Sequence, residues 1–105
     1  MGGKADRRIE SFVKKVRKKV RLELALLFGS RAKGTHLETS DYDLILVSPD
    51  FRGKFFTSRA AELLDLWNYP YDLELFCYTP EEFEELKKRI GIVKTALKEG
   101  VRLKL

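Results

Sequence analysis

Residues 28–44, with the sequence FGSRAKGTHLETSDYDL, connect two short apolar segments of the chain. The preceding segment, 22–28, is apolar and ends at a glycine, which predicts a buried strand followed by a tight turn. Residues 30–33 are long enough for one helical turn, which Gly34 would end. The following segment, 41–47, predicts a second strand. The stretch therefore predicts a strand, a helical turn, a loop and another strand.

The rest of the chain predicts further helices and strands. Apolar residues recur every three or four positions from Asp6 to about Lys19, the pattern of an amphipathic helix. Thr79, Pro80 and Glu82 are typical of a capped helix start, with proline at the first helical position and glutamate completing a capping box. The other expected elements are a helix at 57–67, a strand at 71–78, helical residues at 92–98 between Gly91 and Gly100, and an edge strand at 101–105.

This order of elements predicts an α/β (α+β) fold, with a small mixed sheet and helices packed mainly on one face. A chain of 105 residues has the usual size of one domain, so residues 1–105 are expected to form a single domain. No stretch approaches the roughly 18 apolar residues that a membrane helix needs. The single cysteine, Cys77, excludes an internal disulfide and a multi-cysteine zinc site and is expected in the core. These features favour a cytoplasmic protein.

The formal charge of +5 is unevenly distributed along the chain. Residues 4–21 contain nine Lys or Arg and two acids, whereas residues 81–85 contain four Glu. Two solvated helix faces would explain this pattern. The alternative is a basic face that attracts nucleic acid or nucleotide phosphates. Because aromatic residues are not interleaved with these cations, we do not expect nucleic acid to be a direct substrate. The aromatic residues Trp67, Tyr69 and Tyr71 could stack on a nucleobase, but we interpret them as packing residues because they flank the start of a strand.

Gly29 and Ser30 are candidates for binding phosphate. A strand that runs into Gly-Ser and a helical turn directs backbone N–H groups outward at its end. Gly29 allows the backbone to approach a ligand closely, and Ser30 adds a hydroxyl donor. Arg31 and Lys33 would add positive charge nearby. A nucleoside triphosphate suits that arrangement.

Asp41 and Asp43 are candidates for binding a metal ion. Because they are two residues apart in a predicted strand, their side chains project from the same face. Two neighbouring carboxylates repel each other unless a positive group lies between them. Oxygen-only ligands favour Mg²⁺ or Mn²⁺ over zinc. Such an Asp pair occurs often by chance, and its position after the Gly-Ser turn is what favours a function.

Gly29-Ser30, ten intervening residues and Asp41-Tyr42-Asp43 resemble the signature of the DNA polymerase β-like nucleotidyltransferase superfamily. The surrounding residues resemble its minimal nucleotidyltransferases in particular. The resemblance implies the polymerase β-like fold and transfer of a nucleoside monophosphate, AMP with ATP as the donor. It also implies that Asp41 and Asp43 hold two Mg²⁺ ions, which stabilise the attacking and leaving oxygens at the α-phosphate.

The same resemblance implies a third carboxylate on a later strand, which helps to hold a metal and takes a proton. Asp72 and Glu74 lie on one face of the predicted strand 71–78. We favour Glu74 because it is deeper in the strand and precedes the Tyr-Thr-Pro-Glu-Glu run, and we keep Asp72 as the reserve. His36, the only histidine, is interpreted as a surface loop residue rather than a general base.

Minimal nucleotidyltransferases are commonly paired with a small helical HEPN-domain toxin. The resemblance therefore implies an antitoxin that adds AMP to a tyrosine of that partner. Two alternatives stay open: a non-catalytic antitoxin that only occludes its partner, and an enzyme that modifies a small molecule such as an antibiotic. The exposed edge at 101–105 also leaves a homodimer open.

Overall fold

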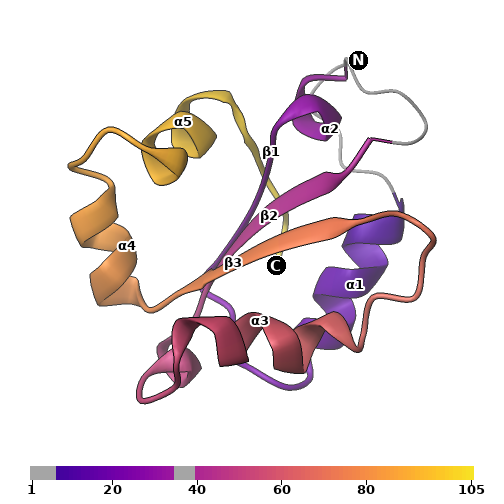
Figure 1. Ribbon diagram of the computed structural model, residues 1–105, viewed down its shortest axis with the longest axis horizontal. Coiled ribbons are helices and arrows are strands. Elements are labelled where there is room, and N and C mark those ends of the chain that lie inside the picture. Colours follow the sequence, from indigo (N-terminus) through magenta and orange to yellow (C-terminus); the bar gives the residue numbers. More distant parts are fainter. Residues whose placement is uncertain (1–6, 35–39) are drawn as a thin grey trace.

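A computed structural model describes residues 7–34 and 40–105 of the chain. His36 and its predicted loop position lie outside these residues. Figure 1 shows a sheet with helices on both sides. The elements, in chain order, are α1 (Arg7–Arg17), β1 (Leu24–Phe28), α2 (Ser30–Lys33), β2 (Tyr42–Val47), the 3₁₀ turn η1 (Pro49–Phe51), α3 (Phe56–Leu64), β3 (Leu73–Tyr78), α4 (Pro80–Leu86), α5 (Ile92–Glu99) and β4 (Val101–Arg102).

The strands form one mixed sheet in the order β3-β2-β1-β4. β1 is antiparallel to both of its neighbours, β2 and β4, whereas β2 and β3 are parallel. The register of β2 places Asp43 between Phe28 of β1 and Glu74 of β3. Residues that are distant in sequence therefore meet at the end of the sheet next to α2, at the top of Figure 1.

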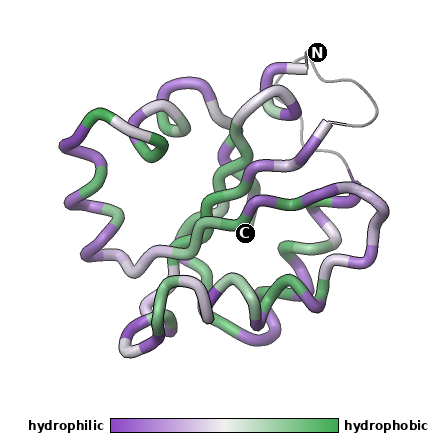
Figure 2. Tube along the Cα trace, viewed as in Figure 1, coloured by the Kyte–Doolittle hydropathy of each residue, from purple (hydrophilic) through white to green (hydrophobic). Residues whose placement is uncertain are grey.

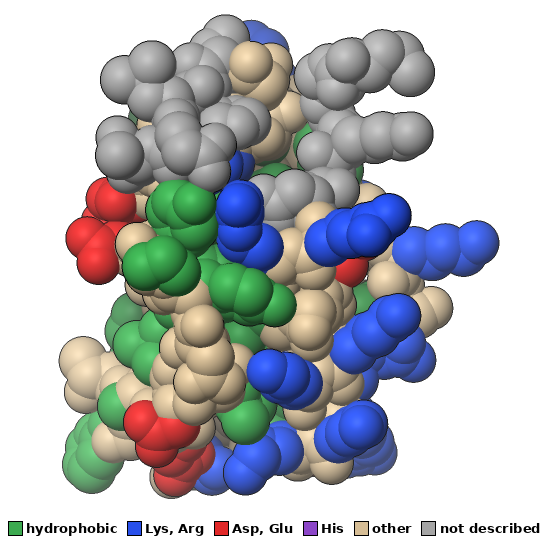
Figure 3. Space-filling model, turned by 90° about the vertical axis from the view of Figure 1, so that its right-hand side faces the viewer, with side chains coloured by type: hydrophobic (Ala, Val, Ile, Leu, Met, Phe, Trp, Pro, Cys, Tyr) green, Lys and Arg blue, Asp and Glu red, His purple; other side chains and the backbone are tan. Residues whose placement is uncertain are grey.

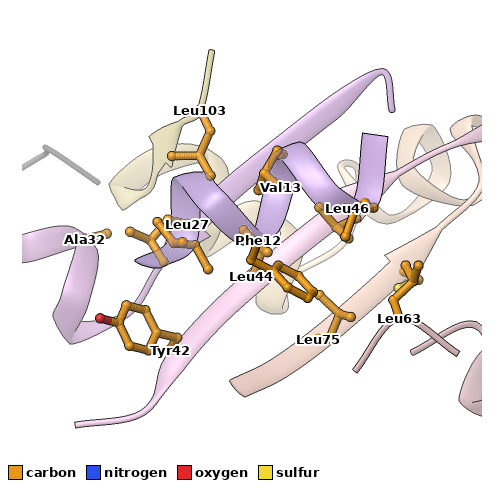
Figure 4. Close-up of a cluster of buried hydrophobic side chains, with 14 of the residues drawn as sticks. Phe12, Val13, Leu27, Ala32, Tyr42, Leu44, Leu46, Leu63, Leu75 and Leu103 are labelled. Atoms are coloured by element: carbon orange, nitrogen blue, oxygen red, sulfur yellow. The ribbon is translucent and has the colours of Figure 1, made fainter. Parts of the chain in front are cut away.

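The sheet buries apolar side chains on both faces, and Figure 2 shows its strands as the most continuously hydrophobic part of the chain. Alternation along each strand sends successive side chains to opposite faces. One face packs against α1 and α3 and forms the larger cluster, part of which is drawn in Figure 4. The other face packs against α4 and α5 through Phe83, Val93 and Ala96. A two-sided core explains why β1 and β2 are apolar almost throughout.

The structure confirms the expected α/β fold with a small mixed sheet. Cys77 is fully buried in the larger cluster, as predicted, and burial raises the pKa of its thiol to about 12. The helices are divided more evenly between the two faces than expected, since α4 and α5 cover the second face. Among the described residues, no helix is long and apolar enough to cross a membrane.

The start of α4 is held by the predicted capping box. The Thr79 side chain accepts a hydrogen bond from the Glu82 N–H, and the Glu82 carboxylate accepts one from the Thr79 N–H. The same carboxylate receives two hydrogen bonds from Arg59 of α3, a residue that is only 5% exposed. Arg59 also donates to the carbonyl of Cys77. This single guanidinium therefore joins α3, the end of β3 and the start of α4.

Replacing Arg59 by methionine is expected to lower the free energy of unfolding by about 2–3 kcal/mol, because buried acceptors lose a charged donor. Chemical denaturation measures the change. The matched control is Arg52→Met, which removes the pair between Arg52 and Glu81, two residues whose side chains are 55% and 64% exposed. That change is expected to have little effect on stability, because solvent screens an exposed ion pair. Equal losses of unfolding free energy in Arg59→Met and Arg52→Met would show that the contacts of Arg59 contribute no more to stability than an exposed ion pair does.

Candidate active site

Gly29 ends β1 in a backbone conformation that favours glycine, with φ 78° and ψ −160°. Its carbonyl accepts hydrogen bonds from the N–H groups of Ala32 and Lys33, which fixes the first turn of α2. A Cβ atom added at Gly29 would overlap Oδ2 of Asp43. The backbone of the Gly-Ser turn and the Asp43 carboxylate are therefore in close contact. Gly34 then ends α2 in the left-handed conformation, as predicted.

Asp43 and Glu74 are directly opposite each other on the parallel strands β2 and β3. The pKa of Asp43 is raised from its ordinary value of 3.8 to about 6. Partial burial is the largest cause, followed by the charge of Glu74, a hydrogen bond with the Glu74 side chain, and the charge of Asp41. The Asp43 carboxyl group therefore keeps its proton to a higher pH than an ordinary aspartate does.

Asp41 and Asp72 lie just outside the strands that were predicted to contain them. β2 begins at Tyr42 and β3 at Leu73, so each acid precedes its strand by one residue. Both side chains are exposed. The carbonyl of Asp72 accepts a hydrogen bond from the Tyr42 N–H, which continues the pairing of the two strands. The structure therefore brings Glu74, rather than Asp72, to Asp43, and it leaves Asp41 close enough to raise the pKa of Asp43.

The chemistry of these carboxylates fits a divalent cation. Asp43 is half-buried and faces two other negative groups, so a cation between them would remove both the repulsion and the burial penalty. The donors are all oxygen atoms, which suit Mg²⁺ or Mn²⁺. In residues 7–34 and 40–105, no three His, Cys, Asp or Glu side chains are yet gathered tightly enough to hold a metal. Asp41, Asp43 and Glu74 would have to converge when an ion binds.

The two predicted phosphate-binding cations are not directed at the carboxylates. Arg31 is 5% exposed, donates two hydrogen bonds to the carbonyl of Ser40 and lies over the Tyr42 ring, 4.2 Å from its centroid. The Tyr42 side chain is on the α1 face of the sheet, opposite to Asp43. Lys33 forms an ion pair with Glu99 of α5, at 2.6 Å. Arg31 therefore packs on Tyr42 and fixes the backbone before Asp41, and its role in binding phosphate stays a prediction.

Phe28 and Phe76 lie beside the carboxylates and were not singled out in the sequence. Phe28 is the register partner of Asp43, and Phe76 follows Glu74 by two residues on the same face of β3. Their ring centroids are 5.8 Å apart, and both residues are partly buried. They give the site an apolar floor, and apolar neighbours of this kind favour the protonated form of a carboxyl group. The sequence did contain a signal for Phe76: it is two residues from Glu74 in the predicted strand, so both side chains are expected on the same face.

Two hollows formed by described residues lie away from this site, since neither Asp43 nor Glu74 lines them. One of about 500 Å³ is formed between α3 and α4, where its lining residues include Phe56, Tyr78 and Leu86. Glutamates line the rest of it, and two of them, Glu81 and Glu82, are paired with arginines. We assign no part of the candidate active site to this hollow, because Asp43 and Glu74 do not line it.

The raised pKa of Asp43 predicts a pH-dependent stability in the absence of divalent metal. Because the folded protein binds this proton more tightly than the unfolded chain, its contribution is full below pH 3.8 and is lost as the pH rises through about 6. The Asp43→Asn variant avoids this pH-dependent loss of stability, because the asparagine side chain does not ionise. After allowance for solvent screening, we expect the variant to be more stable than wild type at neutral pH by about 1 kcal/mol, or about 4–8 °C in Tm.

Thermal unfolding in a chelator between acidic and neutral pH measures this effect. The gap between the variant and wild type should widen as the pH rises, and adding Mg²⁺ should stabilise wild type only. A constant gap across this range would contradict the raised pKa of Asp43.

Comparison with known proteins agrees with this arrangement. Residues 9–103 match the family described as the nucleotidyltransferase domain. A search of curated proteins finds no match. Among solved structures, a protein proposed to be a nucleotidyltransferase from Sulfolobus solfataricus superimposes with a TM-score of 0.61 at 22% sequence identity. The alignment covers 95% of this chain and 88% of that one, so the two share a fold over nearly their whole lengths.

Proposed function

This chain belongs to the nucleotidyltransferase domain family, and from that premise we propose that it transfers AMP from ATP to a hydroxyl group of a partner protein. The observation that carries the proposal is the close approach of the Gly29 backbone to the Asp43 carboxylate, with Glu74 opposite Asp43 on the neighbouring strand. A turn suited to phosphate and acids suited to a divalent cation lie within one small region. That combination is the chemistry that a metal-bound triphosphate requires.

The carboxylates of Asp41, Asp43 and Glu74 would hold the metal, with Asp72 in reserve. Bound divalent ions neutralise the phosphates and stabilise the attacking and leaving oxygens. Ser30, the first residue of α2, donates its hydroxyl to a phosphate oxygen, while the missing side chain of Gly29 lets the Asp43 carboxylate lie against the turn. Phe28 and Phe76 keep water away from one side of the carboxylates.

The transfer itself exchanges one phosphorus–oxygen bond for another. The acceptor hydroxyl oxygen attacks the α-phosphorus, and the bond from that phosphorus to the oxygen bridging the β-phosphate breaks. Pyrophosphate leaves with the bonding electron pair. The hydroxyl proton passes to an Oε atom of Glu74, the carboxylate that the strand register places opposite Asp43.

We propose that the acceptor is a tyrosine of a HEPN-domain toxin, so that the chain acts as a cytoplasmic antitoxin. The support is the resemblance of residues 28–44 to minimal nucleotidyltransferases, which commonly occur with such partners.

The experiment is to incubate the protein with Mg²⁺, labelled nucleoside triphosphates and the product of the neighbouring gene. We expect label from ATP on the partner, with mass spectrometry placing one AMP on a tyrosine. Neutralisation of the partner without label would instead show an occluding antitoxin. Label on an aminoglycoside but not on the partner would show a small-molecule enzyme.

A further inference from the structure

The positive charge of the protein is concentrated in α1 and the turn that follows it. Residues 4–21 hold nine cations and two acids, a net charge of +7, so the rest of the chain carries a net charge of −2. On α3 and α4, cations such as Arg59, Lys87 and Lys88 form ion pairs with glutamates. By contrast, the ion pairs found within the described ranges include neither Lys14 nor Arg17.

A groove runs between α1 and the segment that follows β4. Its volume is about 260 Å³, and its lining residues include Lys14, Arg17 and Lys104, together with Glu10. Lys14 and Arg17 are three positions apart on the helix, so they lie on the same side. Val13 and Leu103 complete the lining. Three cations against one acid make this a groove for anionic groups of phosphate size.

An aromatic cluster lies on the other side of the same helix. Trp67 contacts Phe12 of α1 edge to face at 5.6 Å, and Tyr69 contacts Trp67 at 5.0 Å. Arg8 of α1 lies over Tyr71, at 4.6 Å from the ring centroid. Figure 3, which views the side bearing α1, shows hydrophobic side chains directly beside Lys and Arg. The fold therefore supplies, from the segment before β3, the aromatic residues that the basic segment lacks in sequence.

This surface is separate from the candidate active site. α1 covers the sheet face that carries Leu27, Leu44 and Leu75. Asp43 and Glu74 alternate with these residues along β2 and β3, so their side chains project from the opposite face. A ligand bound along α1 would therefore leave the carboxylates accessible.

We propose that the outer side of α1 binds single-stranded nucleic acid, with backbone phosphates in the groove of Lys14, Arg17 and Lys104 and a base stacked against Tyr69. A basic groove that follows the backbone and an aromatic ring that accepts a base are the two elements of sequence-tolerant single-strand binding, and a strand that crosses α1 would meet one of them on each side of the helix. Tyr69 is partly exposed, so its ring can accept a base. An acidic protein would use the cations and would have no need of the ring, which is why we favour a nucleic acid.

Fluorescence anisotropy with labelled RNA and DNA strands of about 16 nucleotides tests this proposal. The variant Lys14→Glu/Arg17→Glu is compared with Lys88→Glu/Arg89→Glu, which makes the same charge change at two exposed residues of the α4 end. Wild type and the control should bind at about 50 mM salt, while the α1 variant should bind at least about tenfold more weakly. The slope of log affinity against log salt should fall by about 1.4 in the α1 variant only, because two phosphate contacts are lost.

The aromatic contribution is tested with Tyr69→Ala and Tyr69→Phe. Alanine should weaken binding about fivefold or more without changing the salt slope, and phenylalanine should restore it. Tighter binding of the RNA or the DNA strand identifies the natural ligand class. Absence of binding at low salt, equal losses in the two charge variants, or equally tight binding of polyglutamate would overturn the proposal. Asp43→Asn should bind like wild type, so the result is independent of the proposed transfer reaction.

Discussion

Replacing Glu74 by glutamine is expected to lower kcat for nucleotidyl transfer by about 10²–10⁴-fold, the usual effect of losing a proton-transfer group. Glu74 is the register partner of Asp43, and the two side chains share a hydrogen bond. A glutamine of nearly the same shape keeps this packing but cannot accept the acceptor proton. The rate of label transfer from ATP under saturating Mg²⁺ measures the loss.

Asp72→Asn is the matched control for this prediction. Asp72 is on the same strand segment and its side chain is exposed, but it precedes β3 and contributes to the sheet through its backbone carbonyl. The variant should therefore transfer at close to the wild-type rate. If Asp72→Asn loses activity and Glu74→Gln retains it, the reserve carboxylate is the catalytic one.

Replacing Gly29 by alanine is expected to remove most transfer activity and to destabilise the protein. The backbone of Gly29 has φ and ψ values of 78° and −160°, a region almost exclusive to glycine, and a side chain there costs about 1–3 kcal/mol. The added Cβ would also overlap Oδ2 of Asp43, so the carboxylate must move away from the phosphate turn. Thermal unfolding and label transfer, measured at a temperature where the variant is folded, separate the two effects.

Gly53→Ala provides the control, since Gly53 has the same positive φ of 78° but no atoms near its added Cβ. Its alanine variant should lose some stability through backbone strain and keep full activity. A Gly29→Ala protein that is as active as Gly53→Ala would show that the turn does not need to approach Asp43.

The local conformation of residues 28–34 could be predicted because it depends on neighbours in sequence. Gly29, Ser30 and Gly34 have their conformational roles within one turn, and the structure confirms the strand–turn–strand order. The choice between Asp72 and Glu74 could not be made in the same way. Both residues lie on the same face of the predicted strand 71–78. Only the parallel register of β2 and β3 brings Glu74 to Asp43.

Arg31 and Arg59 illustrate what sequence alone does not reveal. Arg31 lies next to Ser30 in the chain, but its side chain is directed to the other face of the sheet, where it packs on Tyr42 and Tyr71. Arg59 has no local signal, because its partners Glu82 and the Cys77 carbonyl are 23 and 18 residues away. In both cases long-range packing determines where the guanidinium lies. The same applies to the aromatic residues that meet α1.

The most direct test of nucleotidyl transfer is the release of labelled pyrophosphate from ATP in the presence of the partner protein, compared between wild type and Asp43→Asn. Both proteins should be folded, and the variant should be at least as stable as wild type without metal. We predict Mg²⁺-dependent release that matches the AMP gained by the partner, and its loss in Asp43→Asn. Equal release by the two proteins would contradict the assignment of this site.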